Sequence, residues 1–271
     1  MRADYNNSMI GIFDSGVGGL SVLRQLKKKA PQANVVYFGD TENAPYGTKS
    51  QKELANLTSM ALRRLLSVGA TDIISACNSV SVSVMFSRID LLRIKLFDMV
   101  EMVQPSVSAL APSGKKILVF GTLATTNSGL YQQAFEKAGV KIDALPIPEL
   151  AGAIERDDPS EIIEAIVSEA VSQALKYHPE IIALCCTHYP FVMDVFKKCV
   201  DEQGSKAVIF DPAFAVVDEV LKRFNTKGGG FLRFLVSKDT PVFRRYVEDY
   251  FGSYPHSIEV SDSIVAILNT V

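Results

Sequence analysis

The chain has 271 residues, of which 48% are apolar and 21% are charged, with a net charge of −2 at neutral pH. This length and balance are typical of a globular protein with a large core, and the lack of a basic excess argues against a nucleic-acid-binding protein. No apolar segment is long enough to span a bilayer, and the first residues lack the apolar core of a signal peptide, so we expect a cytoplasmic protein that does not associate with membranes.

Short apolar runs alternate with amphipathic stretches along most of the chain. We expect strands at 9–13, 35–38, 72–77, 94–97, 116–120, 141–146, 180–186 and 206–210. We expect helices between them at 19–29, 50–67, 127–138, 159–177, 190–201 and 213–224. Continuous apolar strands separated by helices of this length indicate mostly parallel sheets that are flanked by helices on both faces. The predicted fold class is therefore α/β.

The strands fall into two units with the same organisation. IGIFDSG opens the first unit, and about 64 residues later IISACNS ends a strand in a cysteine; ILVFGT and IIALCCTH repeat this arrangement at a similar distance. The repetition predicts two similar lobes that face each other. Ligands of open α/β sheets bind beyond the carboxyl ends of the strands. Cys77 and Cys186, one from each lobe, are therefore expected in the cleft between the lobes.

The cysteines at 77, 185, 186 and 199 are expected to stay reduced, and each of them alone reads most simply as a small buried apolar residue. A nucleophilic Cys186 with His188 as its base would leave Cys77 without a role. The same residues fit no common zinc spacing. Two thiols on opposite sides of a carbon centre can remove a proton from one face and return one to the other. This pattern favours inversion of a carbon centre without a cofactor or a metal.

Two loops carry further candidates. FDSGVGGLSVL lacks the third glycine of a dinucleotide-binding loop, because Ser21 takes that place. Its glycines are expected to leave backbone N–H groups free for a carboxylate near a helix start, and Asp14 serves either this site or only the loop itself. In APYGTKS, the Tyr46 hydroxyl and the Gly47 N–H could meet a ligand, or Tyr46 could simply pack.

Taken together, the motifs resemble those of the glutamate racemases in the aspartate/glutamate racemase superfamily. The resemblance rests on GIFDSGVGGLSVL, YFGDTENAPYGTKS, SACNS, GTLATTNSGLY, CCTHYP and FDPA, which follow in this order over most of the chain. The family uses two cysteines and no cofactor to make D-glutamate for peptidoglycan, which implies an isomerase acting on glutamate. Its members are often homodimers. Its lobes are discontinuous, which implies one lobe of residues 1–98 with 209–271 and a second of residues 99–208.

The resemblance also implies roles for single residues. Cys77 and Cys186 would be the acid–base pair, assisted by Asp14 and His188. Glu155, in LAGAIERDD, lies where the family often has another assisting carboxylate. The residues that would bind glutamate are Asp14, Ser15, Tyr46, Gly47, Asn78, Ser79, Thr187 and His188, with Thr122 and Thr125 as further members.

The chain departs from the family pattern at several places. Cys185 replaces a usual glycine and is interpreted as a packing residue, and Ser79 replaces a usual threonine. Glu101 and Met102 replace a usual Gly-Val near the expected crossover between the lobes. The run VSVSVMF after Ser79 has a strand pattern where the family has a helix. Two alternatives stay open: a racemase of another dicarboxylic amino acid such as aspartate, or a weakly active relative that acts mainly by binding a partner.

Overall fold

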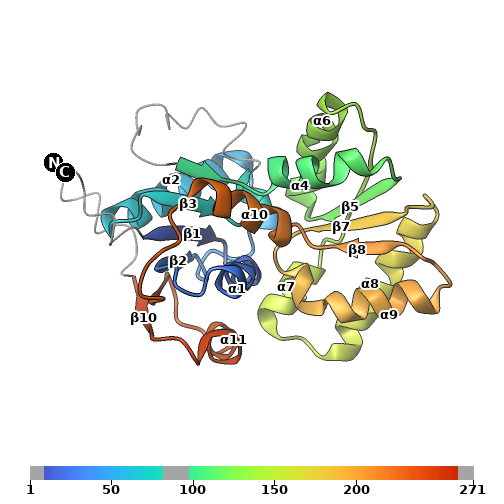
Figure 1. Cartoon of the computed structure of the whole chain (residues 1–271). Helices are drawn as coiled ribbons and strands as arrows, with labels where there is room; N and C mark the ends of the chain where they lie inside the picture. Colours follow the sequence, from blue (N-terminus) through green and yellow to red (C-terminus); the bar gives the residue numbers. More distant parts are fainter. Residues whose placement is uncertain (1–8, 82–97, 262–271) are drawn as a thin grey trace.

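The computed structural model describes residues 9–81 and 98–261. Two parallel β-sheets, each with helices on both faces, form two lobes that lie side by side (Figure 1). This arrangement confirms the predicted α/β class with two lobes. Within the described residues no helix is both long enough and apolar enough to cross a membrane.

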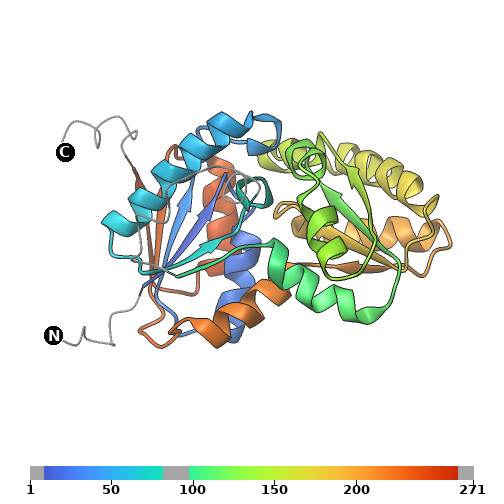
Figure 2. The same ribbon diagram turned by 90° about the horizontal axis from the view of Figure 1, so that it is seen from above.

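The first sheet contains β1 (Ile10–Asp14), β2 (Val35–Gly39), β3 (Asp72–Ser75), β4 (Asp98–Val100), β9 (Leu232–Val236) and β10 (His256–Val260). Its strand order is β10-β9-β2-β1-β3-β4, and all neighbouring strands are parallel. The helices on one face are α1 (Leu20–Lys29), α10 (Ala213–Arg223) and α11 (Pro241–Phe251), whereas α2 (Gln51–Ser67) covers the other face (Figure 2). Alternating apolar side chains of the buried strands pack against both layers.

The second sheet contains β5 (Ile117–Gly121), β6 (Asp143–Pro146), β7 (Ile181–Cys185) and β8 (Val208–Phe210), in the order β6-β5-β7-β8. One face packs against α7 (Leu150–Arg156), α8 (Ser160–Leu175) and α9 (Met193–Glu202). The other face packs against α4 (Val103–Leu110) and α6 (Leu130–Lys137). The short helix α5 (Leu123–Asn127) directly follows β5.

Most predicted elements are present, with shifted ends, but several expectations need correction. The helix expected at 127–138 begins only at Leu130, because Gly129 has a φ of 67°, and the preceding short helix α5 ends at Asn127. The strand pattern expected after Ser79 is wrong at Val80 and Ser81, because their N–H groups donate to the Cys77 carbonyl in a helical turn. The rest of that run, and the strand expected at 94–97, lie outside the described residues.

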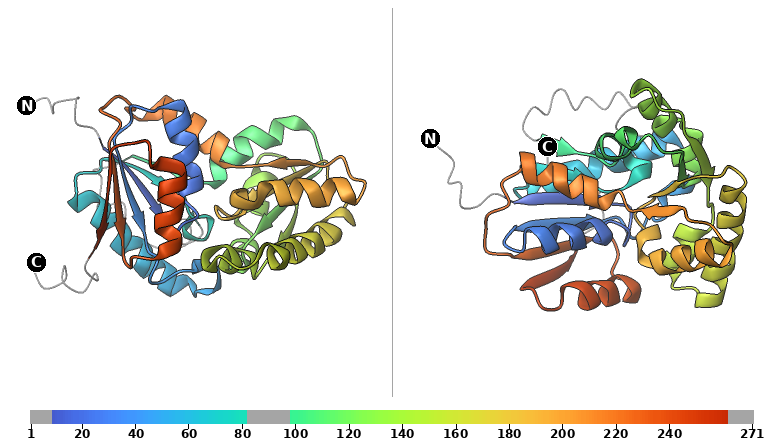
Figure 3. Two further views of the ribbon diagram at one scale, coloured as in Figure 1. Left: turned by 90° about the horizontal axis from the view of Figure 1, so that it is seen from below. Right: turned by 45° about the vertical axis from the view of Figure 1, so that its right-hand side comes forward.

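The chain passes between the lobes near the predicted boundaries. β4 pairs with β3 in the first sheet, and the predicted boundary after residue 98 falls within it. β8 pairs with β7 in the second sheet, so the boundary predicted after residue 208 falls within this strand. The later strands return to the first sheet, where β9 pairs with β2 and β10 pairs with β9 at the edge (Figure 3).

Tyr189 joins two segments under the second sheet. Its side chain is fully buried, and its hydroxyl lies 3.0 Å from the carbonyl oxygens of both Gly121 and Ile147. These carbonyls belong to the end of β5 and to the segment that leads into α7. The hydroxyl therefore ties the start of α7 to the sheet.

We expect Tyr189→Phe to lower the free energy of unfolding by about 1–2 kcal/mol, because a buried carbonyl loses its hydrogen-bond donor while the ring packing is kept. Urea denaturation followed by circular dichroism measures this change. Tyr177→Phe is the matched control, since Tyr177 is 40% exposed and its hydroxyl should contribute little. Equal free energies of unfolding for Tyr189→Phe and Tyr177→Phe would contradict the structural role of the buried hydroxyl.

Candidate active site

One small pocket lies between the carboxyl ends of strands from both sheets. Four of its residues come one or two positions after the end of a strand. Ser15 follows β1 and Cys77 follows β3 in the first sheet, and Thr122 follows β5 and Cys186 follows β7 in the second. The residues that line the pocket are Ser15, Pro45, Tyr46, Gly47, Cys77, Asn78, Ser79, Thr122, Ala151, Cys186, Thr187 and His188. The fold thus brings both candidate thiols and most of the predicted binding residues to one place.

The pocket is nearly closed. It leaves about 10 Å³ for the centre of a water-sized sphere, and one water molecule needs about that much. Cys77 and Cys186 are each only 5% exposed. In this arrangement the pocket has room for little more than one water molecule.

The two thiols have different surroundings. The Cys77 thiol donates to the Ser15 hydroxyl over 3.7 Å, and burial together with the nearby Asp14 carboxylate raises the pKa of Cys77 to about 12. The sulfur of Cys186 lies 3.9 Å from Nδ1 of His188. Cys77 is therefore held as a neutral thiol in this closed arrangement, whereas Cys186 has an imidazole beside it that can exchange a proton.

His188 is held by a carboxylate on its far side. Its Nε2 lies 2.6 Å from Oε2 of Glu155, which α7 carries toward the pocket. Burial alone would lower the pKa of His188, but the hydrogen bonds to Cys186 and Glu155 outweigh it and raise this pKa well above its usual value. The imidazole is therefore held as a cation between a carboxylate and a thiol.

Asp14 lies behind the pocket and links the lobes. Its Oδ1 accepts from the Gly16 N–H at 2.8 Å, and its Oδ2 accepts from the Thr187 hydroxyl at 3.0 Å. Burial raises the pKa of Asp14, and the nearby His188 cation partly counteracts this. Asp14 does not line the pocket, so its direct contacts are with the loop and with Thr187.

The glycine-rich loop binds carboxylates of the protein itself. The Gly16 N–H donates to Asp14, and the Val17 N–H donates to Glu155 at 3.3 Å, so the expectation of free N–H groups is wrong at these positions. A Cβ added at Gly18 would lie 2.6 Å from Nδ1 of His188. The glycines therefore make room for the imidazole and its carboxylate.

The loop before α2 closes one side of the pocket. The Tyr46 ring is buried in the pocket wall, and its hydroxyl donates to the Asp40 carboxylate at 2.5 Å. Burial raises the pKa of Tyr46, so the phenol stays neutral. A Cβ added at Gly47 would lie 2.8 Å from the Cβ of Thr122. Gly47 therefore permits the closest approach between this loop and the second lobe.

A row of three hydroxyl groups connects the two lobes beside the pocket. The Ser79 and Thr122 hydroxyl oxygens are 3.1 Å apart, and the Thr122 and Thr125 hydroxyl oxygens are also 3.1 Å apart. Ser79 belongs to the first lobe and Thr122 to the second. Thr125 does not line the pocket and acts on it only through Thr122.

The remaining departures from the family pattern lie outside the pocket wall. Glu101 accepts hydrogen bonds from the N–H groups of Val103 at 2.5 Å and Gln104 at 2.7 Å, so it caps the first turn of α4. Cys185 is the last residue of β7, and its side chain is fully buried between the second sheet and the helices α4 and α6. This burial raises its pKa to about 12. Tyr131, a residue that the sequence reasoning did not single out, donates from its hydroxyl to Oδ1 of Asn78 at 2.6 Å.

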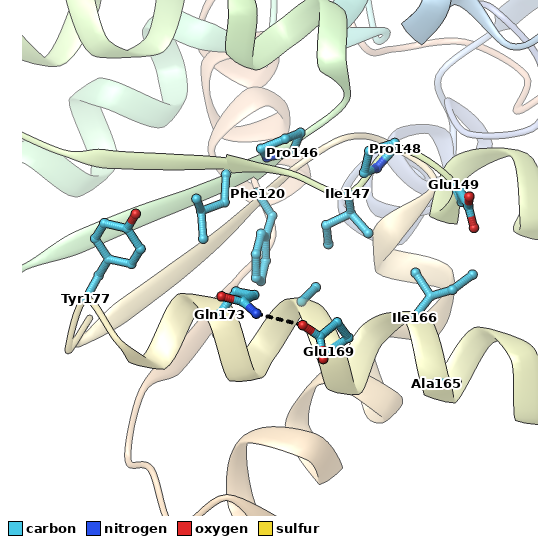
Figure 4. Close-up of a pocket in the computed structure, with 12 residues that line it drawn as sticks. Phe120, Pro146, Ile147, Pro148, Glu149, Ala165, Ile166, Glu169, Gln173 and Tyr177 are labelled. Carbon is cyan, nitrogen blue, oxygen red and sulfur yellow. Dashed lines mark hydrogen bonds between the residues drawn. The ribbon is translucent and has the colours of Figure 1, made fainter.

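A roomier cavity lies on the second lobe, with about 570 Å³ for the centre of a water-sized sphere, between the end of β6 and α8 (Figure 4). Its wall is mostly apolar, and its carboxylates are Glu149 and Glu169, the latter bonded to Gln173. It contains no thiol or imidazole and shares no residue with the thiol pocket. Within the described residues, no three His, Cys, Asp or Glu side chains are grouped so that they could hold a metal ion.

Comparison with known proteins agrees with this geometry. The model of the Asp/Glu/Hydantoin racemase family matches residues 18–220. The chain belongs to this family. The glutamate racemase of Clostridium perfringens is 33% identical over 227 residues, which are 82% of this chain and 85% of that protein. Glutamate racemase 3 of Caldanaerobacter subterraneus is 32% identical over 244 residues, which are 86% and 87% of the two chains.

A solved structure extends the likeness to the whole fold. The glutamate racemase isoform RacE1 from Bacillus anthracis superposes with a TM-score of 0.82 at 25% identity, covering 96% of this chain and 99% of that one. The two-lobed arrangement of this racemase family member is therefore shared with a glutamate racemase of known structure.

We expect Glu155→Gln to lower the pKa of His188, because the imidazolium loses its paired negative charge. Nuclear magnetic resonance titration of the histidine ring carbons measures this, with His178 and His256 as internal references. Glu169→Gln in the separate cavity is the control and should leave the titration unchanged. An unchanged pKa of His188 in Glu155→Gln would contradict the ion pair.

The same pair makes stability depend on pH. The pKa of His188 in the folded protein is raised above its usual value of 6.5. While Glu155 is ionised, the stabilisation is therefore complete below pH 6.5 and is lost as the pH rises through the raised pKa. The difference in unfolding free energy between the wild type and Glu155→Gln should therefore become smaller as the pH rises through the raised pKa of His188.

Proposed function

We propose that the protein is a glutamate racemase that needs no cofactor, with Cys77 and Cys186 acting on opposite faces of the α-carbon. The observation that carries this proposal is the single pocket lined by two thiols, each at the end of a strand of a different lobe. The membership in the racemase family and the relatives that are named glutamate racemase support glutamate as the substrate.

The reaction breaks the Cα–H bond on one face and forms a new one on the other. In the direction from L- to D-glutamate, the Cys186 thiolate takes the α-proton, and the electron pair of that bond moves onto the α-carboxylate. The Cys77 thiol then delivers its proton to the opposite face, and the electron pair returns to the carbon. The reverse direction exchanges the two roles, so one thiol and one thiolate are always needed.

The surroundings of each thiol suit this division. His188 lies beside Cys186 and can exchange a proton with it, and Glu155 holds the imidazole in place. Burial and Asp14 keep Cys77 protonated before the reaction. After Cys77 has given up its proton, the Ser15 hydroxyl and the Val80 N–H can donate to the thiolate.

The substrate would be held by polar groups from both lobes. Of the predicted set, we assign this role directly to Ser15, Gly47, Asn78, Ser79, Thr187 and His188, which line the pocket. Tyr46 also lines it, but its hydroxyl and the Asp14 carboxylate already have protein partners. Asp14 and Tyr46 are therefore proposed to shape the site and to hold the groups that touch glutamate.

The wider context follows from the family. We propose that the D-glutamate supplies peptidoglycan synthesis, that the enzyme works in the cytoplasm, and that its lobes divide as the sequence predicts, apart from the ends of β4 and β8. Contacts such as the Arg245–Asp157 ion pair and the stacking of Phe191 on Tyr246, with ring centroids 4.4 Å apart, support closure of the lobes. A homodimer remains a prediction.

A racemisation assay over L- and D-glutamate, aspartate and a diaminodicarboxylic acid tests the proposal. We expect glutamate to be converted fastest with no cofactor added. Cys77→Ser and Cys186→Ser should each lower kcat by about 100-fold or more, because a serine hydroxyl is a far weaker base than a thiolate. Cys199→Ser, a buried thiol on α9, is the control and should stay active.

Each other outcome excludes a part of the proposal. Faster conversion of aspartate would show a different substrate. Conversion of none of the amino acids would favour a protein that acts by binding a partner. Full activity of either active-site serine variant would contradict the two-thiol mechanism.

A further inference from the structure

Asn78 carries a buried donor with no protein partner. It lines the thiol pocket, its side chain is 2% exposed, and its Nδ2 forms no hydrogen bond within the described residues. A buried amide N–H without a partner is costly, by about 1–3 kcal/mol. A donor left open at a pocket wall is therefore suited to an acceptor on a ligand, such as a substrate carboxylate.

The other end of the Asn78 amide is held from the opposite lobe. The hydroxyl of Tyr131, on α6, donates to Oδ1 of Asn78 at 2.6 Å. Both side chains are buried, and Tyr131 is 1% exposed. Tyr131 does not line the pocket, so it acts on a ligand only through Asn78.

The chemistry of the two groups sets the direction of this hydrogen bond. An amide oxygen can only accept, so the phenol proton of Tyr131 points to Oδ1 of Asn78.

We propose that Tyr131 is a positioning residue that fixes the orientation of the Asn78 amide, so that both Nδ2 hydrogens are available to a carboxylate of the substrate. If the amide were turned over, Oδ1 would face the carboxylate and repel it. This inference rests on the proposed glutamate racemase function.

Tyr131→Phe tests the proposal because it removes the donor and keeps the ring. We expect the KM for glutamate and the Kd for D-glutamate, measured by calorimetry, to rise about tenfold, as the loss of one orienting hydrogen bond implies. The kcat should change less than about threefold, because ground-state binding acts on KM. Tyr254→Phe, in the first lobe away from the pocket, is the control and should change neither constant.

A double-mutant cycle separates positioning from a general effect on the fold. If Tyr131 acts through Asn78, Tyr131→Phe should raise the Kd no further in an Asn78→Ala background.

Two results would overturn the inference. Additive effects of Tyr131→Phe and Asn78→Ala on the Kd would show that the tyrosine acts elsewhere. An unchanged Kd and KM in Tyr131→Phe, with a wild type that binds and racemises glutamate, would refute the inference alone. A wild type that does not bind glutamate would refute both the inference and the proposed function.

Discussion

The close approach of the two lobes at a few glycines is the constraint on which the site depends. Cβ atoms at Gly16, Gly18 and Gly47 would lie within 3 Å of Glu155, His188 or Thr122, which all belong to the second lobe. Larger residues at these positions would hold the strand ends apart. Two thiols on separate sheets can share one pocket only because this contact surface has so little bulk.

The contact between the lobes also gives the two thiols different electrostatic surroundings. On the first lobe, burial and the nearby Asp14 carboxylate favour the neutral thiol of Cys77. On the second lobe Cys186 has the His188–Glu155 pair. A reaction that needs one acid and one base in each direction is served by two chemically equal groups in unequal surroundings. The hydrogen bonds of Asp14 to the loop and to Thr187 connect the two halves.

The sequence predicted the features that have a local signal. The buried strands β1, β2, β5 and β7 are continuous apolar runs, and the motifs at their ends led to the thiols. β9 and β10 were missed because Arg233 interrupts one run and the other is a half-exposed edge strand; the Arg233 guanidinium pairs with Glu259 of β10 at 2.7 Å, a contact visible only in three dimensions. The helical turn at Val80 likewise overrides a β-branched strand pattern.

The missed parts of the site are contacts between lobes. Tyr131 and Asn78 are 53 residues apart, and only the docking of α6 against the first lobe brings them together. The same holds for the carboxylates that occupy the glycine-rich loop. The loop motif predicts exposed N–H groups, but which carboxylate takes them depends on how α7 packs.

Racemisation of L-glutamate in D₂O, followed by proton nuclear magnetic resonance, tests the two-face mechanism most directly. In the proposed mechanism, the proton that Cys186 removes is not the one that Cys77 delivers. The D-glutamate formed in the first turnovers should therefore carry deuterium at the α-carbon, while the remaining L-glutamate keeps its proton. Early D-glutamate that retains the proton of the substrate would show that a single base serves both faces and would contradict the mechanism.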